Sequence, residues 1–452
     1  MRSPFLLIAV VLSFAIALPA CAVDLPDDPL TLEECVAIAE LCNPSLVIAR
    51  QSVVRSEAEL QQALSAYYPT ADLVLTRGRT GGTTFVDTPA GRIPVATVGE
   101  RREADVVIGQ RVWELGRREL VRSARFSLSA SRAEEQATGQ DLVLSVSQGY
   151  YAALAAEQLV EVAQATLAAS RDHEKLVRAR AEVGEGAPVD VAPAEADAAL
   201  AEFSLLQAEN DAALAKAQLK REMGVPATYN LRLAPSRLAA PERPLPPLAD
   251  DLRQALHCRP EAISLRNAIC AGEQDLRAAK AREYGVIAVS AQYDRGVAGP
   301  DDEDSWLALL SASAFLFDGG GRAAATKIAR ANLRTLQAQE RQLANAIGLE
   351  VESARLEVET ARKSVQSGEK AVTSAEAQLA AAEGKYKAGV GIFVEILDAQ
   401  KAVARARTDL VRARYDLQTA LVALRRAMGE PLWGGVAHPN GVAEPLTPGA
   451  TP

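Results

Sequence analysis

The side chains that most often do chemistry are few and scattered in this 452-residue chain. Its three histidines, His173, His257 and His438, lack the spacing of metal ligands. The sequence contains no nucleophile elbow, no phosphate-binding loop and no dinucleotide-binding glycine motif. It therefore gives no positive support for catalysis, and it predicts neither a cofactor nor a metal site.

One pair of carboxylates has a spacing that would matter in a pore. Glu395 and Asp398 lie one turn apart on a predicted helix and so share one face. Such a pair is ordinarily a solvated charged face. Repeated around a symmetric opening, it would form rings of carboxylates that favour cations. The formal net charge is -9 and we expect no basic stripe, which argues against nucleic-acid binding.

Five cysteines occur, at Cys21, Cys35, Cys42, Cys258 and Cys270. On one continuous helix, the Cα atoms of Cys35 and Cys42 would lie about 10 Å apart, which is too far for a disulfide. The sequence leaves the pairing of the last four cysteines open, and it favours buried small hydrophobic side chains for them.

Residues 1–22 are typical of an export signal. Arg2 is followed by an apolar run over residues 5–18 and then by small residues. The run is too short to span a bilayer as a helix. Two cleavage routes remain open: an A-x-A site at 20–22, or a lipobox that places a lipid on Cys21. No later segment is predicted to cross a membrane as an apolar helix, so membrane insertion would require strands.

The chain repeats itself. Cys42-Asn43-Pro44 matches Cys258-Arg259-Pro260 at an offset of 216, and Met223-Gly224 matches Met428-Gly429 at an offset of 205. The change of offset places about eleven extra residues in the first half, near the Gly- and Thr-containing stretch 78–99. We therefore predict two repeats at 30–225 and 249–430, a proline-rich linker at 226–248 and an irregular tail at 431–452.

Each half is predicted to contain one or two short helices, two strands and a long helical hairpin. The expected helices and strands of the first half are 45–66, 71–79, 103–113 and 118–182, and those of the second are 249–257, 261–283, 287–293, 306–317 and 322–387. Thr31 and Glu34 have the spacing of a capping box. Strands of this length suit a tilted membrane strand, and the unbroken long helices favour a coiled coil. Four strands cannot close a barrel, so strands in a membrane would require several copies.

Several motifs follow one another on this duplicated frame. They are Thr31-Leu32-Glu33-Glu34 before Asn43-Pro44, Tyr67-Tyr68-Pro69-Thr70, and Phe317-Asp318-Gly319-Gly320-Gly321-Arg322. Over residues 30–430 the chain resembles the TolC-like outer-membrane efflux family. The resemblance implies a mainly α fold with a small β part, assembled as a homotrimer. A twelve-stranded β-barrel in the outer membrane would continue into a periplasmic barrel of twelve helices.

The resemblance also implies a passive conduit for efflux or type I secretion, served by a periplasmic adaptor (a membrane fusion protein) and an inner-membrane pump. The adaptor would contact the hairpin tips, although any helical hairpin needs a similar glycine turn. These tip residues are Val183, Gly184, Gly186, Gly389, Val390 and Gly391. The aperture would be controlled by Asp190, Tyr386, Glu395 and Asp398.

Two further predictions concern the strand ends. Asp318, Gly319, Gly320 and Arg322 are expected to position a strand-to-helix junction, and the first-half equivalent around Trp113 is degraded. Aromatic residues at predicted strand ends suit either a membrane-interface belt or ordinary core packing. These are Tyr68, Trp113, Tyr284 and Trp306.

Two other architectures fit parts of this pattern. A periplasmic adaptor carries a single helical hairpin between lipoyl-like and β-barrel parts, whereas this chain has two hairpins. A soluble coiled-coil scaffold needs neither an export signal nor alternating Ser/Ala strands. The duplication favours the channel over both.

Overall fold

The computed structural model describes residues 26, 28–89, 91–183, 188–235, 246–282, 286–296, 304–313, 317–388 and 390–431. The chain divides into two compact units. The first unit is formed by Met1–Pro44, Leu142–Pro241 and Thr360–Thr419, and the second by Ser45–Asp141, Glu242–Glu359 and Ala420–Pro452. The predicted signal segment, and with it the candidate lipid site at Cys21, lies outside the described residues, as does Tyr284.

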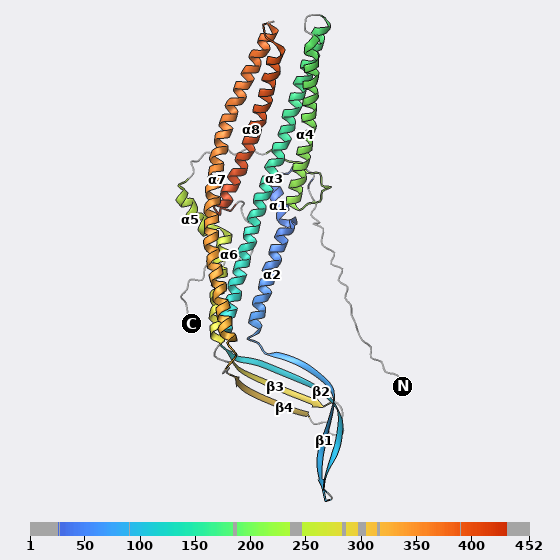
Figure 1. Cartoon of the computed structure of the whole chain (residues 1–452), viewed down its shortest axis with the longest axis vertical. Helices are drawn as coiled ribbons and strands as arrows, with labels where there is room; N and C mark the ends of the chain where they lie inside the picture. Colours follow the sequence, from blue (N-terminus) through green and yellow to red (C-terminus); the bar gives the residue numbers. More distant parts are fainter. Residues whose placement is uncertain are drawn as a thin grey trace, which may run out of the picture. The chain divides into compact units, whose positions relative to one another are not determined.

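Both halves show the predicted order of elements (Figure 1). The first half consists of α1 (Leu32–Cys42), α2 (Pro44–Ser65), β1 (Thr70–Thr88), β2 (Gly91–Glu114), α3 (Arg117–Glu182), the short 3-10 helix η1 (Pro188–Asp190) and α4 (Val191–Met223). The second consists of α5 (Leu248–Cys258), α6 (Pro260–Ala281), β3 (Val286–Gly296), β4 (Asp304–Ser313), α7 (Gly321–Lys387) and α8 (Phe393–Ala427). None of the described helices is both long enough and apolar enough to span a membrane.

The first β-hairpin is longer than its sequence suggested. β1 and β2 contain 19 and 24 residues, against 11 and 10 for β3 and β4. The prediction that the strands end at 79 and resume at 103 is wrong, because pairing continues to Thr88 and Gly91. Cross-strand pairs such as Val86 with Ile93 compensate for the low strand propensity of the glycines. The surplus of the first half is thus a two-stranded extension.

The four strands form one antiparallel sheet in the order β1-β2-β3-β4, within the second unit. Because side chains alternate along a strand, the register fixes which residues share a face. Val289 lies opposite Leu310, Tyr293 opposite Trp306, and Val106 opposite Leu73. One face therefore carries apolar side chains from all four strands. The members of this apolar face are Ala71, Leu73, Leu75, Val106, Ile108, Trp113, Ile287, Val289, Ala291, Tyr293, Trp306, Ala308, Leu310 and Ala312.

A bulge in β2 corrects one detail of the predicted alternation. The sequence pattern placed Val112 with Val106 and Ile108. The register shifts between Arg111 and Trp113, so Trp113 lies opposite Ile287 instead. A bulge adds one unpaired residue and reverses the alternation beyond it. The indole therefore joins the apolar face at the end of the strand.

The duplicated sequence markers meet in space. In the first unit, Gly224 ends α4 with φ +73, and a Cβ there would lie 2.7 Å from the carbonyl oxygen of Cys42. In the second unit, Gly429 has φ +72, and its Cβ would lie 2.9 Å from the backbone nitrogen of Arg259. Only glycine tolerates this combination of left-handed backbone and close approach. Each Met-Gly thus packs against the Cys-x-Pro of its own half.

The start of α1 agrees with the sequence prediction, and the cysteines agree with it only in part. The predicted capping box is confirmed, since Thr31 Oγ1 accepts from Glu34 N at 3.3 Å and Glu34 Oε2 accepts from Thr31 N at 2.8 Å. Cys35, Cys258 and Cys270 are free thiols, so none of these three pairs with another. Cys35 is buried as expected, but the expectation of a buried side chain is wrong for Cys258, which is exposed.

Each unit has its own core. In the first, Tyr150, Leu219 and Met223 are fully buried, and the Tyr150 hydroxyl donates to the carbonyl of Ala234 at 2.7 Å. In the second, Ala255, Ile347, Val351 and Val358 join α5 to α7. Burial raises the pKa of the Tyr150 hydroxyl far above its ordinary range, so this hydroxyl stays a neutral donor.

Candidate functional site at the hairpin ends

The hairpin ends present exposed apolar side chains. Val183 at the end of α3 and Val390 after α7 are 71% and 80% exposed. Val189, Ile392 and Val394, which the sequence reasoning did not single out, are exposed beside them. Their signal was available, because β-branched residues flank both tip glycines. Gly184, Gly186 and Gly389 lie outside the described residues.

Gly391 is required by the turn after α7. The backbone nitrogens of Val390 and Gly391 both donate to the carbonyl of Lys385, at 3.1 Å. A Cβ on Gly391 would lie 2.9 Å from the Lys385 Cβ. Position 391 is therefore closed to any larger side chain in this conformation.

Tyr386 belongs to an aromatic cluster that joins the two hairpins within the first unit. The Arg180 guanidinium lies 5.0 Å from the Tyr386 ring centroid, a cation–π contact. Tyr386 and Phe393 have ring centroids 6.2 Å apart, and Phe393 and His173 have centroids 6.0 Å apart in an edge-to-face arrangement. We call these four residues the hairpin clamp.

Phe393 is the centre of the hairpin clamp. It is almost fully buried among Val177 of α3, Ala194 of α4 and Leu397 of α8. Three helices thus contribute to one small core near the tips. Sequence reasoning named Tyr386 and missed the other three members, because no spacing along the chain links α3 to α8.

Asp190 is placed differently from Tyr386. It is the last residue of η1 and the N-cap of α4, and its side chain makes no capping hydrogen bond. Among the described residues, no hydrogen bond joins Asp190 to Tyr386. The resemblance to the TolC-like family implies that these two residues hold the mouth closed by hydrogen bonding, and that role stays a prediction.

Glu395 and Asp398 are both exposed on α8, while Ile396 and Leu397 between them are buried. Neither carboxylate has an ion-pair partner among the residues that the structure describes. The two acids therefore share one water-facing side of the helix near its N-terminus, as their spacing predicted.

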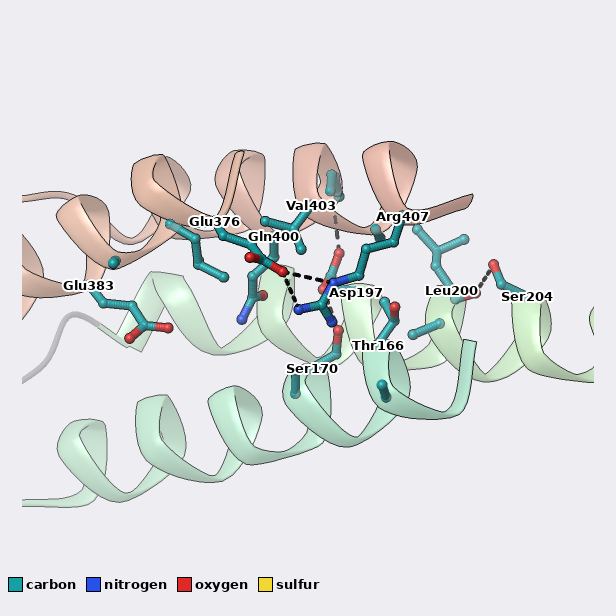
Figure 2. A pocket seen from close by; sticks show the side chains of 17 residues that line it. Thr166, Ser170, Asp197, Leu200, Ser204, Glu376, Glu383, Gln400, Val403 and Arg407 are labelled. Carbon is teal, nitrogen blue, oxygen red and sulfur yellow. Dashed lines mark hydrogen bonds and ion pairs between the residues drawn. The ribbon is translucent and has the colours of Figure 1, made fainter. Parts of the chain in front are cut away.

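A cavity of about 530 Å³ lies between the hairpins in the first unit (Figure 2). Its charges are largely paired: Arg407 contacts Glu376 at 2.7 Å, and Asp197 accepts from Ser170 at 2.9 Å and lies 3.5 Å from Lys401. Gln400 Oε1 is buried there without a hydrogen-bond partner. Sequence reasoning did not find this cavity, because its walls come from all four long helices.

The strand-to-helix junction of the second half is a compact hydrogen-bonded turn. Asp318 Oδ2 accepts from the backbone nitrogen of Arg322 at 2.8 Å and from its Nε at 2.9 Å, and Oδ1 accepts from Gly320 N at 3.1 Å. These bonds, with the backbone bond first, lower the pKa of the Asp318 carboxyl. Gly319 and Gly320 have φ +64 and +89, so both use conformations that favour glycine.

The degraded first-half motif keeps the same parts. Gly116 has φ +91, and Arg117 lies 3.6 Å from Glu114. Arg117 also donates to the carbonyl of Arg111 at 2.8 Å, and its guanidinium stacks 5.1 Å from the Tyr67 ring centroid. An acid, a glycine and an arginine thus form both junctions.

Comparison with known proteins gives these features a context. The sequence profile described as "Outer membrane efflux protein" matches residues 37–225 and 252–430. Protein CyaE of Bordetella pertussis is 27% identical over 333 residues, which cover 72% of this chain and 69% of that protein.

Solved structures share the fold. The CmeC outer membrane channel of Campylobacter jejuni superposes with a TM-score of 0.78 at 15% identity, covering 88% of this chain and 85% of that one. The outer membrane protein VceC of Vibrio cholerae gives 0.74 at 20% identity, with 89% and 97% covered. Because the family profile spans both repeats, the chain belongs to the outer membrane efflux protein family.

Proposed function

We propose that this chain is one protomer of a passive export channel in the outer membrane. The observation that carries the proposal is the apolar face of the sheet. Trp306 and Leu310 on this face are 78% and 75% exposed. An apolar face of this size on a soluble protein would be covered, whereas lipid is its natural surroundings.

The sheet also supports assembly with further copies. β1 and β4 each have one edge without a partner strand among the described residues. Unpaired backbone groups in hydrocarbon are costly, so a sheet in a bilayer closes on itself. Three copies would supply twelve strands. The long hairpins α3–α4 and α7–α8 would then line a tunnel of twelve helices in the periplasm.

The hairpin ends support docking of a periplasmic adaptor, which an inner-membrane pump would accompany. Their exposed apolar residues, such as Val183 and Val390, are what a helical partner buries on binding. Three copies of Glu395 and Asp398 would line the mouth with carboxylates. In this scheme the protein catalyses no reaction, and its aperture residues open or close the export channel.

The decisive experiment is to express the full chain with its own signal and extract the outer membrane. We expect a heat-sensitive oligomer with the mass of a trimer, and discrete channels in planar lipid bilayers. A monomer found in the soluble periplasmic fraction would overturn the proposal. If the acids line the mouth, polyvalent cations should change the conductance of the wild-type channel. The double variant Glu395→Gln/Asp398→Asn should lose this response.

A further inference from the structure

The helices that leave the sheet begin with an excess of positive charge. The first fourteen residues of α3, 117–130, contain four arginines and one acid, Glu119. The first fourteen of α7, 321–334, contain four basic residues and no acid. The whole chain has a net charge of -9. The expectation of no basic stripe is therefore wrong for this one region.

Four of these cations recur at equivalent positions of the two halves. The offset of 205 that aligns Arg117 with Arg322 also aligns Arg122 with Lys327 and Arg125 with Arg330. We call Arg122, Arg125, Lys327 and Arg330 the junction cations. Arg122 is half-buried and the other three are exposed. None of the four has an ion pair or side-chain hydrogen bond within the described part of the chain.

The junction cations do not serve the helices that carry them. In each helix they are three residues apart, so two like charges are neighbours on one face. Neighbouring like charges destabilise a helix. Both pairs also lie toward the N-terminal end, where the helix dipole does not stabilise cations. The junction cations recur in both halves although their mutual repulsion destabilises the helices. This recurrence points to an anionic partner outside the chain.

Their position identifies that partner. Trp113 and Phe317 are exposed beside the starts of α3 and α7, and aromatic side chains of this kind mark the boundary between lipid and water. At a rise of 1.5 Å per residue, the junction cations lie roughly 8 to 14 Å beyond the helix starts. Helical side chains lean toward the N-terminus, so these long side chains reach back toward the sheet.

We propose that the junction cations bind the headgroups of anionic phospholipids in the inner leaflet of the outer membrane. Clustered Lys and Arg next to a membrane segment attract such headgroups. Binding would hold the ends of the strands at a fixed depth. The proposal rests on the outer-membrane location of the family, and on the sheet being the membrane part.

The test uses the full chain purified in a non-ionic detergent and titrated with phosphatidylglycerol or phosphatidylcholine, with thermal stability as the readout. We expect phosphatidylglycerol to raise the Tm of the wild type more than phosphatidylcholine does. The variant R122Q/R125Q/K327Q/R330Q should require about tenfold more phosphatidylglycerol for the same shift. A matched variant, K363Q/K370Q/R412Q/R425Q, removes four exposed cations elsewhere and should behave as the wild type.

Circular dichroism and single-channel recordings of each variant separate the possible failures. A helical, conducting junction variant that keeps the wild-type preference for phosphatidylglycerol would overturn the proposal. An equal effect of inorganic phosphate would assign the cations to small anions instead. Unchanged lipid preference with altered ion selectivity would place them inside the conduit. Absence of any channel in the wild type would refute the proposed function rather than this inference.

Discussion

At the scale of single residues, glycine positions are decided by backbone shape and by what lies a few ångströms away. Gly224 and Gly429 combine left-handed backbone with backbone atoms that would stand less than 3.0 Å from a Cβ. Gly348, in the middle of α7, has ordinary helical backbone and nothing within 4 Å. Glycine is therefore required at positions 224 and 429, whereas nothing in the structure requires it at position 348.

This contrast gives the first prediction. Gly224→Ala or Gly429→Ala should destabilise the protein by about 2 kcal/mol or more, from left-handed strain and displaced backbone. Gly348→Ala should stabilise it by about 0.5–1 kcal/mol. Thermal unfolding of the three variants measures the difference. Equal effects at Gly224 and Gly348 would show that the close packing is absent.

The second prediction concerns the hairpin clamp. Tyr386→Phe keeps the ring beneath Arg180, so closed-state conductance in planar bilayers should stay at the wild-type value. Arg180→Ala removes the cation–π contact, worth about 1 kcal/mol, and should raise the open population about fivefold. Phe393→Ala should open the channel further, because it empties the centre of the cluster.

The same recordings test the alternative, in which a hydrogen bond rather than the hairpin clamp keeps the mouth closed. If a hydrogen bond between Tyr386 and Asp190 kept the mouth closed, Tyr386→Phe and Asp190→Ala would both raise the closed-state conductance. Raised conductance in Tyr386→Phe together with no change in Arg180→Ala would therefore reject the hairpin clamp.

At the scale of elements, the two halves use the same layout with different chemistry. In the second unit, Arg426 at the end of α8 lies 2.6 Å from Asp141 of α3 and 3.0 Å from Glu350 of α7, and it also pairs with Glu261 of α6. Its first-half counterpart, Arg221, is 78% exposed, and its only ion pair within the described residues is with its neighbour Glu222. Arg426 therefore links four helices, whereas Arg221 lies on the surface.

The third prediction uses this internal control. Arg426→Ala removes one cation from three carboxylates, of which Glu261 and Glu350 keep Arg259, and should cost about 1–3 kcal/mol. That is less than for a fully buried pair, because these acids keep contact with water. Arg221→Ala should change stability by less than about 0.5 kcal/mol. Comparable losses in chemical denaturation would contradict the assignment.

At the scale of the whole molecule, the strand register determines which side chains share a face of the sheet. Leu310 and Ser311 are neighbours in β4 that point to opposite faces. The face of Leu310 is mainly apolar, whereas the face of Ser311 mixes Ser290 and Gln292 with Leu307 and Leu309. Neither residue type alone indicates which face carries most of the apolar side chains, whereas the alignment of all four strands does.

The fourth prediction follows. Leu310→Arg puts a charge on the proposed lipid face, at a cost of about 2–4 kcal/mol near the middle of the bilayer. It should sharply reduce the amount of oligomer in the outer membrane. Ser311→Arg changes the neighbouring residue and should assemble normally. Quantifying heat-sensitive oligomer in membrane fractions compares them, and equal assembly would refute the facing of the sheet.

Much of the architecture was predictable from residues that act locally. The capping box at Thr31, the proline breaks and the duplicated glycines set the ends of the helices, because these signals operate within one turn. The extension of β1 to Thr88 was not predictable. A glycine-rich strand forms only when its partner is aligned, and propensity does not describe the partner.

The candidate site divides in the same way. Glu395 and Asp398 share an exposed face because they are three residues apart on one helix, a relation fixed by helix geometry. The hairpin clamp escaped prediction because Arg180 and His173 lie in the first half of the chain and Phe393 in the second. Contact between them depends on how two hairpins pack.

The sequence by itself determined the duplication, the order of elements and the family, since each rests on local patterns repeated at constant offset. Only the tertiary structure decided that each Met-Gly closes on its own Cys-x-Pro, that one sheet face carries apolar side chains from all four strands, and that Tyr386 sits beneath Arg180. These relations depend on strand register and helix packing. Both are set by the sum of many distant contacts, none of which is written at a single position of the chain.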